Sequence, residues 1–315
     1  MLDILSITSP IYFIIGLGFG LTKVGLFSKL DMRVFGKFVL NLALPALVFK
    51  ALSQRQFSDI VNSSYLLAYM VGSLMVLTVG YFWTRKVAGH SPLTSTFYAM
   101  GMGCSNSGFV GYPILLLTLA PVAGVVLALN MLVENLVILP LLLVLAERGK
   151  GSGHAGKALV QSLTKVAKTP LIVGLLAGLL VSVSGCKLPA PVVQTVTLFS
   201  NASGALSLFV IGGALMGLPL AGMGSRVWPI VLGKLVLHPA LVLLSILALP
   251  YVGLAPLDAS LRTGALLLAA MPMMGIYPTL AQAYGQEDFA AAATLVTTVL
   301  SFFSISGLLW VLQHV

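Results

Sequence analysis

Residues 104–113 read CSNSGFVGYP and interrupt an apolar segment that is long enough to cross a membrane. A second interruption, MPMMGIYP at residues 271–278, falls in another apolar segment of that length, and both stretches end in a Tyr-Pro pair. Backbone released from helical hydrogen bonding is costly in lipid, so it persists only where protein covers it or where it lines a watery cavity. Two matched breaks in the two halves of a membrane protein indicate a transport site.

The composition predicts a polytopic membrane protein. Hydrophobic residues make up 58% of the chain and charged residues only 8%, with a mean hydropathy of +1.06. A soluble domain carries about 25% charged residues. The first residues, MLDIL, include an acid and lack the basic region of a signal peptide, so we expect the first apolar segment to remain as a span.

The net charge of +9 does not indicate nucleic-acid binding, because the basic residues lie in short loops between apolar segments and form no basic face. The two cysteines, Cys104 and Cys186, belong to no metal-binding spacing. We interpret both as packing residues. No metal, cofactor or nucleic acid is therefore expected.

Ten apolar runs approach the roughly 20 residues that a helix needs to span lipid. They cover residues 8–26, 33–52, 63–84, 93–117, 121–146, 169–186, 191–217, 227–250, 260–284 and 289–313. The one linker-like segment, residues 147–168, divides five spans from five. Both halves, 1–146 and 169–315, therefore hold an odd number of spans, and a structural repeat between them must be inverted across the membrane.

The basic residues predict the orientation, because cytoplasmic loops collect Lys and Arg. One set of alternate loops holds twelve of the 17 basic residues, and the other set holds Lys50, Arg55, Lys187 and Arg262. We therefore expect a plasma membrane protein with both termini outside and the central linker in the cytoplasm. In a bacterium this would be the inner membrane.

Two further spans carry residues that weaken helices. Asn41 and Pro45 lie in the middle of the second span, and Asn201 lies in the middle of the seventh. These residues predict helix breaks, and their similar positions in the two halves give faint support to an inverted repeat. The alternative is chance similarity between two apolar sequences.

The two main breaks contain the groups that bind a carboxylate. When a helix stops inside a membrane and restarts, the restarting half presents free N–H groups and about half a positive charge. Crossed breaks would hold one small anion between two such ends, whereas an ordinary proline kink would hold nothing. The candidate binding residues are Ser105, Asn106, Ser107, Gly108, Gly111, Pro113, Pro272, Met273, Gly275, Tyr277 and Pro278.

Ionisable residues inside spans are costly and are functional candidates. Glu134 follows Asn130 by one helical turn, and Lys234 precedes His238 by one turn on a shared helix face. A pair of Glu134 and Lys234, with His238 to titrate, could couple protons to transport. The alternative is that Lys234 reaches toward an interface while neighbouring amides satisfy Glu134.

Residues 106–113, NSGFVGYP, resemble the Asn-Thr-Gly-x-x-Gly-x-Pro signature in the fourth span of the auxin efflux carrier family, which includes bacterial malonate-type carriers. The resemblance extends over essentially the whole chain. It implies ten helices in two inverted repeats, similar to bile-acid and sodium/proton exchangers, with spans 1, 2, 6 and 7 as scaffold and spans 3–5 and 8–10 as transport domain. It also implies a carboxylate site where spans 4 and 9 cross, with Asn106, Pro113 and Pro278 at matching positions.

The chain departs from the plant members in two respects. Met273 and Met274 stand where those exporters have one residue, and the central linker is short. The resemblance therefore does not support auxin as the substrate.

Together these observations predict an all-α secondary active transporter of a small organic anion, such as a malonate-like carboxylate, that works by alternating access. Protons as the coupling ion and a homodimer as the assembly are kept open. The alternatives are a sodium-coupled carrier and a membrane sensor that uses the same pocket. An intramembrane enzyme is set aside because the spans hold one acid, Glu134, and no His-Glu-x-x-His spacing occurs.

Overall fold

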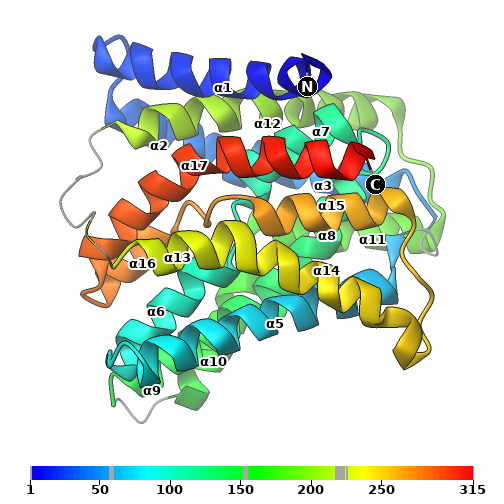
Figure 1. Ribbon diagram of the computed structural model, residues 1–315. Helices are drawn as coiled ribbons and strands as arrows, with labels where there is room; N and C mark the ends of the chain where they lie inside the picture. Colours follow the sequence, from blue (N-terminus) through cyan, green and yellow to red (C-terminus); the bar gives the residue numbers. More distant parts are fainter. Residues whose placement is uncertain (1, 57–59, 152–154, 217–223, 225, 315) are drawn as a thin grey trace. The chain divides into compact units, whose positions relative to one another are not determined.

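The computed structural model describes residues 2–56, 60–151, 155–216, 224 and 226–314, and every element within them is a helix (Figure 1). Six helices are long and apolar enough to cross a membrane: 29–53, 63–86, 123–149, 190–215, 228–252 and 289–312. Three shorter apolar helices are Ser107–Thr118, Pro170–Ser184 and Ala259–Ala270. The chain is thus a multi-pass helical membrane protein, and the inverted repeat of ten spans stays a prediction.

The helices form two compact units, and each unit takes segments from both halves of the sequence. Unit 1 comprises residues 1–62, 108–129 and 166–217, and unit 2 comprises residues 63–107, 130–165 and 218–315. The four spans predicted as scaffold fall in unit 1. Residues 108–129, predicted to belong to the transport domain, also fall in unit 1.

Unit 1 is built from helices that approach each other closely through glycine. Its elements are α1 (Leu2–Lys23), α2 (Lys29–Phe38), η1 (Val39–Ala43), α3 (Leu44–Ser53), α7 (Tyr112–Thr118), the first part of α8 (Ala123–Val133), α11 (Pro170–Ser184) and α12 (Ala190–Leu215). Gly18 and Gly212 bring α1 against α12, which run side by side in Figure 1. Gly174 lets α11 approach the backbone of α3 at Pro45. Small residues permit such contacts between helices in lipid.

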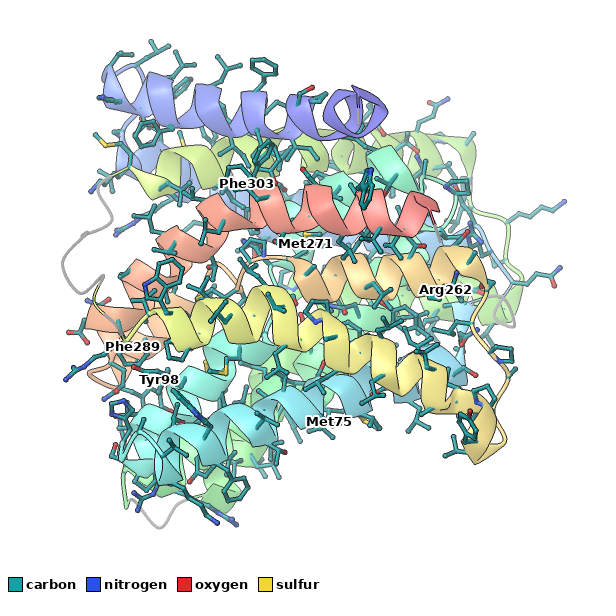
Figure 2. All side chains as sticks on the ribbon, in the orientation of Figure 1. Met75, Tyr98, Arg262, Met271, Phe289 and Phe303 are labelled. Atoms are coloured by element: carbon teal, nitrogen blue, oxygen red, sulfur yellow. The ribbon has the colours of Figure 1, made fainter. Side chains whose placement is uncertain are left out.

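Unit 2 holds the second break and residues 104–107 of the first break, whereas residues 108–113 belong to unit 1. Its elements are α5 (Ser63–Lys86), α6 (Pro92–Gly103), η3 (Glu134–Ile138), α9 (Leu139–Gly149), α10 (Ala155–Ala167), α13 (Trp228–Leu232), η4 (Gly233–Leu237), α14 (His238–Ala248), η5 (Leu249–Val252), α15 (Ala259–Ala270), α16 (Tyr277–Ala283) and α17 (Glu287–His314). Gly72 of α5 packs against the backbone of Val242 in α14. The rings of Tyr98 and Phe289, labelled in Figure 2, lie 4.8 Å apart and join α6 to α17.

Four π turns interrupt the α-helical pattern, and each ends two residues before a proline. They are η1 before Pro45, η2 (Ser107–Gly111) before Pro113, η3 before Pro140 and η4 before Pro239. Proline lacks an N–H, and its ring clashes with the carbonyl four residues earlier. A widened turn relieves this clash while the helix continues.

The predicted breaks in the second and seventh spans need correction. Asn41 lies in the π turn η1, where its Nδ2 donates to the Lys37 carbonyl at 2.7 Å, and the helix continues through Pro45 to Ser53. The helix α12 is unbroken at Asn201. That segment contains no proline after its first turn, so its N–H groups remain available for helical hydrogen bonds.

The predicted linker contains structure of its own. Helix α9 runs to Gly149, and α10 occupies Ala155–Ala167. Residues 152–154 lie outside the described residues.

Candidate functional site

The two predicted breaks pair with each other in unit 2. Helix α6 ends at Gly103 and α15 ends at Ala270, and each is followed by extended backbone. The Asn106 N–H donates to the Pro272 carbonyl at 2.8 Å, and the Met274 N–H donates to the Cys104 carbonyl at 3.3 Å. Ser105 and Met273 thereby form a short antiparallel bridge. The pairing satisfies backbone groups that the interrupted helices leave without helical partners.

A buried carboxylate contacts the first break. Glu134, the first residue of η3, is 8% exposed. Its Oε1 accepts from the Ser105 N–H at 3.0 Å, and its Oε2 accepts from the Ser107 hydroxyl at 3.2 Å. The Asn130 Nδ2 also donates to the Ser107 oxygen, at 2.7 Å. The three predicted residues Glu134, Ser107 and Asn130 therefore meet where the fourth span restarts.

A buried ammonium contacts the same break from η4. The Lys234 Nζ, which is fully buried, donates to the Ser105 hydroxyl oxygen at 2.6 Å and to the Ala269 carbonyl at 3.0 Å. It also contacts the His238 Nδ1 at 2.8 Å. A lysine ammonium has three donors, and these three partners use all of them. Three acceptors therefore hold Lys234 inside the protein. Its side chain does not reach toward a membrane interface, which was the alternative interpretation of the sequence.

Glu134 and Lys234 are connected through Ser105. The Tyr69 hydroxyl lies 3.4 Å from the Ser105 hydroxyl and donates to Glu134 at 3.4 Å. A Lys234 ammonium that donates to His238 Nδ1 places the ring proton on Nε2, which lies 3.0 Å from the Ser73 hydroxyl. One continuous hydrogen-bonded network thus links the third, fourth, fifth, eighth and ninth spans.

The remaining predicted residues of unit 2 have distinct surroundings. A Cβ atom on Gly275 would lie 3.7 Å from the Asn106 Nδ2, and Gly275 itself is exposed. The buried Tyr277 hydroxyl donates to the Phe97 carbonyl at 2.9 Å, so it anchors the restart of the ninth span. Pro278 lies in the first turn of α16, where its missing N–H costs no helical bond.

Three predicted residues belong to the restarting half of the fourth span. Gly108 and Gly111 lie in η2, and Pro113 lies in the first turn of α7. The restart begins at Ser107 with a π turn, six residues before Pro113, so the proline shapes the turn without setting the start of the helix.

Sequence reasoning missed Tyr69, Ser73 and the Ala269 carbonyl. Tyr69 and Ser73 are one helical turn apart in an apolar span, so their spacing carried a signal. The carbonyl carried none, because no side chain marks it. Within the described residues, the buried Asn130 Oδ1 accepts no hydrogen bond.

The fold and the paired breaks define a multi-pass membrane protein with a polar centre inside its spans. The family model described as "Membrane transport protein" matches residues 4–310, so the chain belongs to this family of membrane transporters. It is the auxin efflux carrier family, and the resemblance inferred from residues 106–113 is confirmed.

Individual relatives agree with this family. The chain is 27% identical over 99% of its length to a Rhizobium meliloti protein named "Putative malonate transporter", of which it covers 97%. It is also 27% identical to an Escherichia coli (strain K12) protein named "Uncharacterized transporter YfdV", over 64% of this chain and 66% of that one. An uncharacterized transporter of Methanothermobacter thermautotrophicus is 28% identical over 31% of this chain and 32% of its own length.

Proposed function

We propose that this protein is a secondary active transporter of a small organic anion of the carboxylate class, with malonate as the first candidate. The observation that carries the proposal is the pairing of the two breaks at Asn106 and Pro272, inside a unit that also buries Lys234 and Glu134. Non-helical backbone at membrane depth is typical of substrate sites in transporters. A relative matched over nearly its full length also bears malonate in its name.

Donors for a carboxylate gather at the second break. Gly275 and Ile276 are exposed, and within the described residues their N–H groups donate to no other group. The Asn106 amide lies against Gly275. The N–H groups of Gly275 and Ile276 are thus available to one carboxylate beside the Asn106 amide, and hydrogen bonds to an ionised acceptor are the strong ones.

We infer a structural role for Ser105 and Ser107 in addition to the predicted contact with substrate. Their donors and acceptors already bind Glu134 and Lys234. We infer that they stabilise the backbone conformation of the first break, while Asn106 and Gly275 face the substrate. Alternating access would then move the paired breaks as one piece.

Flux into proteoliposomes tests the proposal. We expect saturable uptake of radiolabelled malonate by the wild type and loss of uptake in Asn106→Ala. The matched control is Gln194→Ala, which changes an exposed amide of unit 1. Saturable binding without uptake would identify a sensor. Unchanged uptake by Asn106→Ala would show that the site is elsewhere.

We propose protons as the coupling ion, because the Lys234, Ser105, Tyr69 and Glu134 side chains form a continuous chain of hydrogen-bonding groups. The test imposes a pH gradient, a sodium gradient or a membrane potential, one at a time. Uptake that follows the sodium gradient alone would contradict proton coupling.

We also propose that the protein lies in the plasma membrane with both termini outside. Cys186 is exposed and Cys104 is buried, so a membrane-impermeant maleimide reports on Cys186. We expect labelling of intact cells, and none in Cys186→Ser. Labelling that needs permeabilised cells would reverse the orientation.

A further inference from the structure

A polar cavity in unit 1 takes no part in the site described above. It has a volume of about 630 Å³, within the range typical of small-molecule sites, and its walls come from α3, α7, α8 and α12. The hydrogen-bonding side chains that line it are Lys50, Gln54, Arg55, Tyr112, Ser200 and Asn201. All of them belong to unit 1, whereas the segments that pair, 104–107 and 271–274, belong to unit 2.

The cavity is positively charged. Among the described residues that line it, Lys50 and Arg55 are basic and none is acidic. Both are among the four basic residues on the side expected to face outward, where the positive-inside rule disfavours Lys and Arg. Basic residues that contradict this rule and share one cavity point to a local function for their charge.

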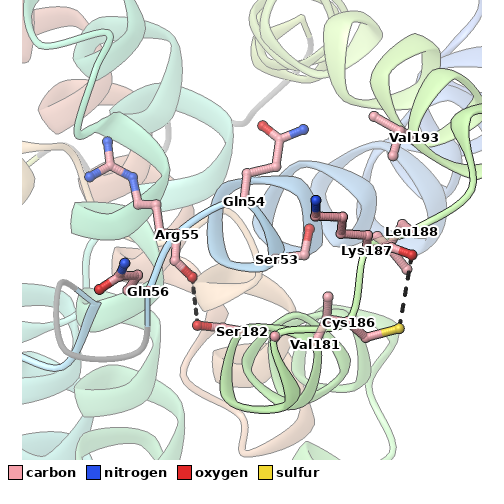
Figure 3. Close-up of a pocket in the computed structure, with 11 residues that line it drawn as sticks. Ser53, Gln54, Arg55, Gln56, Val181, Ser182, Cys186, Lys187, Leu188 and Val193 are labelled. Carbon is pink, nitrogen blue, oxygen red and sulfur yellow. Dashed lines mark hydrogen bonds between the residues drawn. The ribbon is translucent and has the colours of Figure 1, made fainter.

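Arg55 is fixed in place from two directions. Its Nη2 donates to the Pro121 carbonyl, across the cavity wall formed by the start of α8. Its own carbonyl accepts from the Ser182 hydroxyl at 2.7 Å. Figure 3, centred on a neighbouring cavity, shows this carbonyl directed at Ser182 and the guanidinium directed away from it. The guanidinium has five donors, so the bond to Pro121 leaves others for a ligand.

Neutral donors complete the lining. Tyr112 is only 8% exposed, and within the described residues its hydroxyl has no hydrogen-bond partner. The Gln54 and Asn201 amides and the Lys50 ammonium likewise have none there. The Tyr112 hydroxyl and these groups can therefore donate to a ligand in the cavity that accepts hydrogen bonds.

We propose that this cavity is a second anion-binding site, which takes a small organic dianion such as a dicarboxylate. Lys50 and Arg55 neutralise the two negative charges, while Tyr112, Gln54 and Asn201 donate to the carboxylate oxygens. The phosphate of an anionic lipid headgroup shares part of this chemistry. Two cations with neutral donors around them fit a dianion better than the single charge of a phosphodiester.

The stoichiometry of binding tests the proposal. The full-length protein is purified in a neutral detergent, and radiolabelled malonate is measured by equilibrium dialysis. We expect two malonate ions per chain in the wild type and one in the Lys50→Gln/Arg55→Gln variant. Lys50→Gln alone should weaken the second site about tenfold or more, as expected for a lost charged hydrogen bond.

Two basic residues serve as matched controls. Lys187 lines the neighbouring cavity of Figure 3, and Arg262, labelled in Figure 2, lies in the first turn of α15 in unit 2. Lys187→Gln and Arg262→Gln should each retain two bound ions. An equal loss in these variants would show a general charge effect and overturn the proposal. Wild-type stoichiometry in Lys50→Gln/Arg55→Gln would also overturn it.

Further measurements distinguish malonate binding in this cavity from binding at the paired breaks and from binding of a lipid headgroup. Asn106→Ala should lose the other malonate ion and keep the one at Lys50 and Arg55, so failure of the transport site is distinguishable from failure of this one. Binding is repeated with added phosphatidylglycerol. The lipid could displace the second malonate ion from the wild type and fail to bind to the Lys50→Gln/Arg55→Gln variant. This result would identify a headgroup site and overturn the proposal of a soluble anion.

Discussion

Replacing Lys234 by methionine should destabilise the protein strongly. The side chain keeps most of its volume, but three contacts of the ammonium are lost: Ser105 at 2.6 Å, His238 at 2.8 Å and the Ala269 carbonyl at 3.0 Å. Glu134 then remains buried without the cation that faces it through Ser105.

The magnitude follows from the cost of an uncompensated buried charge. Removing one partner of a buried ion pair costs about 3–5 kcal/mol of unfolding free energy. Glu134→Gln should cost a similar amount, because it leaves the Lys234 ammonium buried. The Glu134→Gln/Lys234→Met double variant removes both charges, so its loss should be smaller than the sum by about 1–3 kcal/mol.

Unfolding in mixed micelles of a neutral detergent and dodecyl sulfate measures these free energies for the four proteins. The Lys50→Gln variant, which changes a lysine of unit 1, is the control and should stay close to the wild type. Losses that add within about 0.5 kcal/mol would refute the coupling of Glu134 and Lys234 through Ser105.

The remaining predictions concern packing and access. Tyr277→Phe should cost about 0.5–1.5 kcal/mol in the same unfolding assay, because it removes a buried hydrogen bond to the Phe97 carbonyl. Gly212→Ala should destabilise the packing of α1 on α12, whereas Gly204→Ala, on the same helix with nothing within 4 Å, should change stability by less than about 1 kcal/mol. Gly275→Leu should abolish malonate uptake by proteoliposomes and leave the elution volume of the protein in size-exclusion chromatography unchanged, because its side chain would extend toward Asn106.

The positions of the main breaks were predictable from the sequence because their causes are local. Pro272 and the Gly and Ser residues of 104–108 disfavour a helix whatever tertiary contacts surround them. The π turns have an equally local cause, since each precedes a proline by two residues. Asn201 misled the prediction because its side chain is exposed and its backbone stays within the unbroken helix α12.

The connections across the site were less predictable, because they depend on which spans become neighbours. Sequence spacing placed Asn130 near Glu134 and Lys234 near His238, and both pairs share a network. It did not indicate that Ser105 would join the two charges. That contact requires the fourth, fifth and eighth spans to meet, and no local pattern encodes this meeting.

The charge balance of the site supports coupling to a cation. Glu134 and Lys234 carry opposite charges in one buried network, so the protein contributes little net charge there. A dicarboxylate bound at Asn106 and Gly275 would therefore bring its own negative charge to membrane depth with only neutral donors around it. Moving an elementary charge across the membrane costs about 2.3 kcal/mol per 100 mV. Protons that accompany the anion would reduce this electrical work, and uptake of malonate should therefore become less sensitive to membrane potential as the external pH falls.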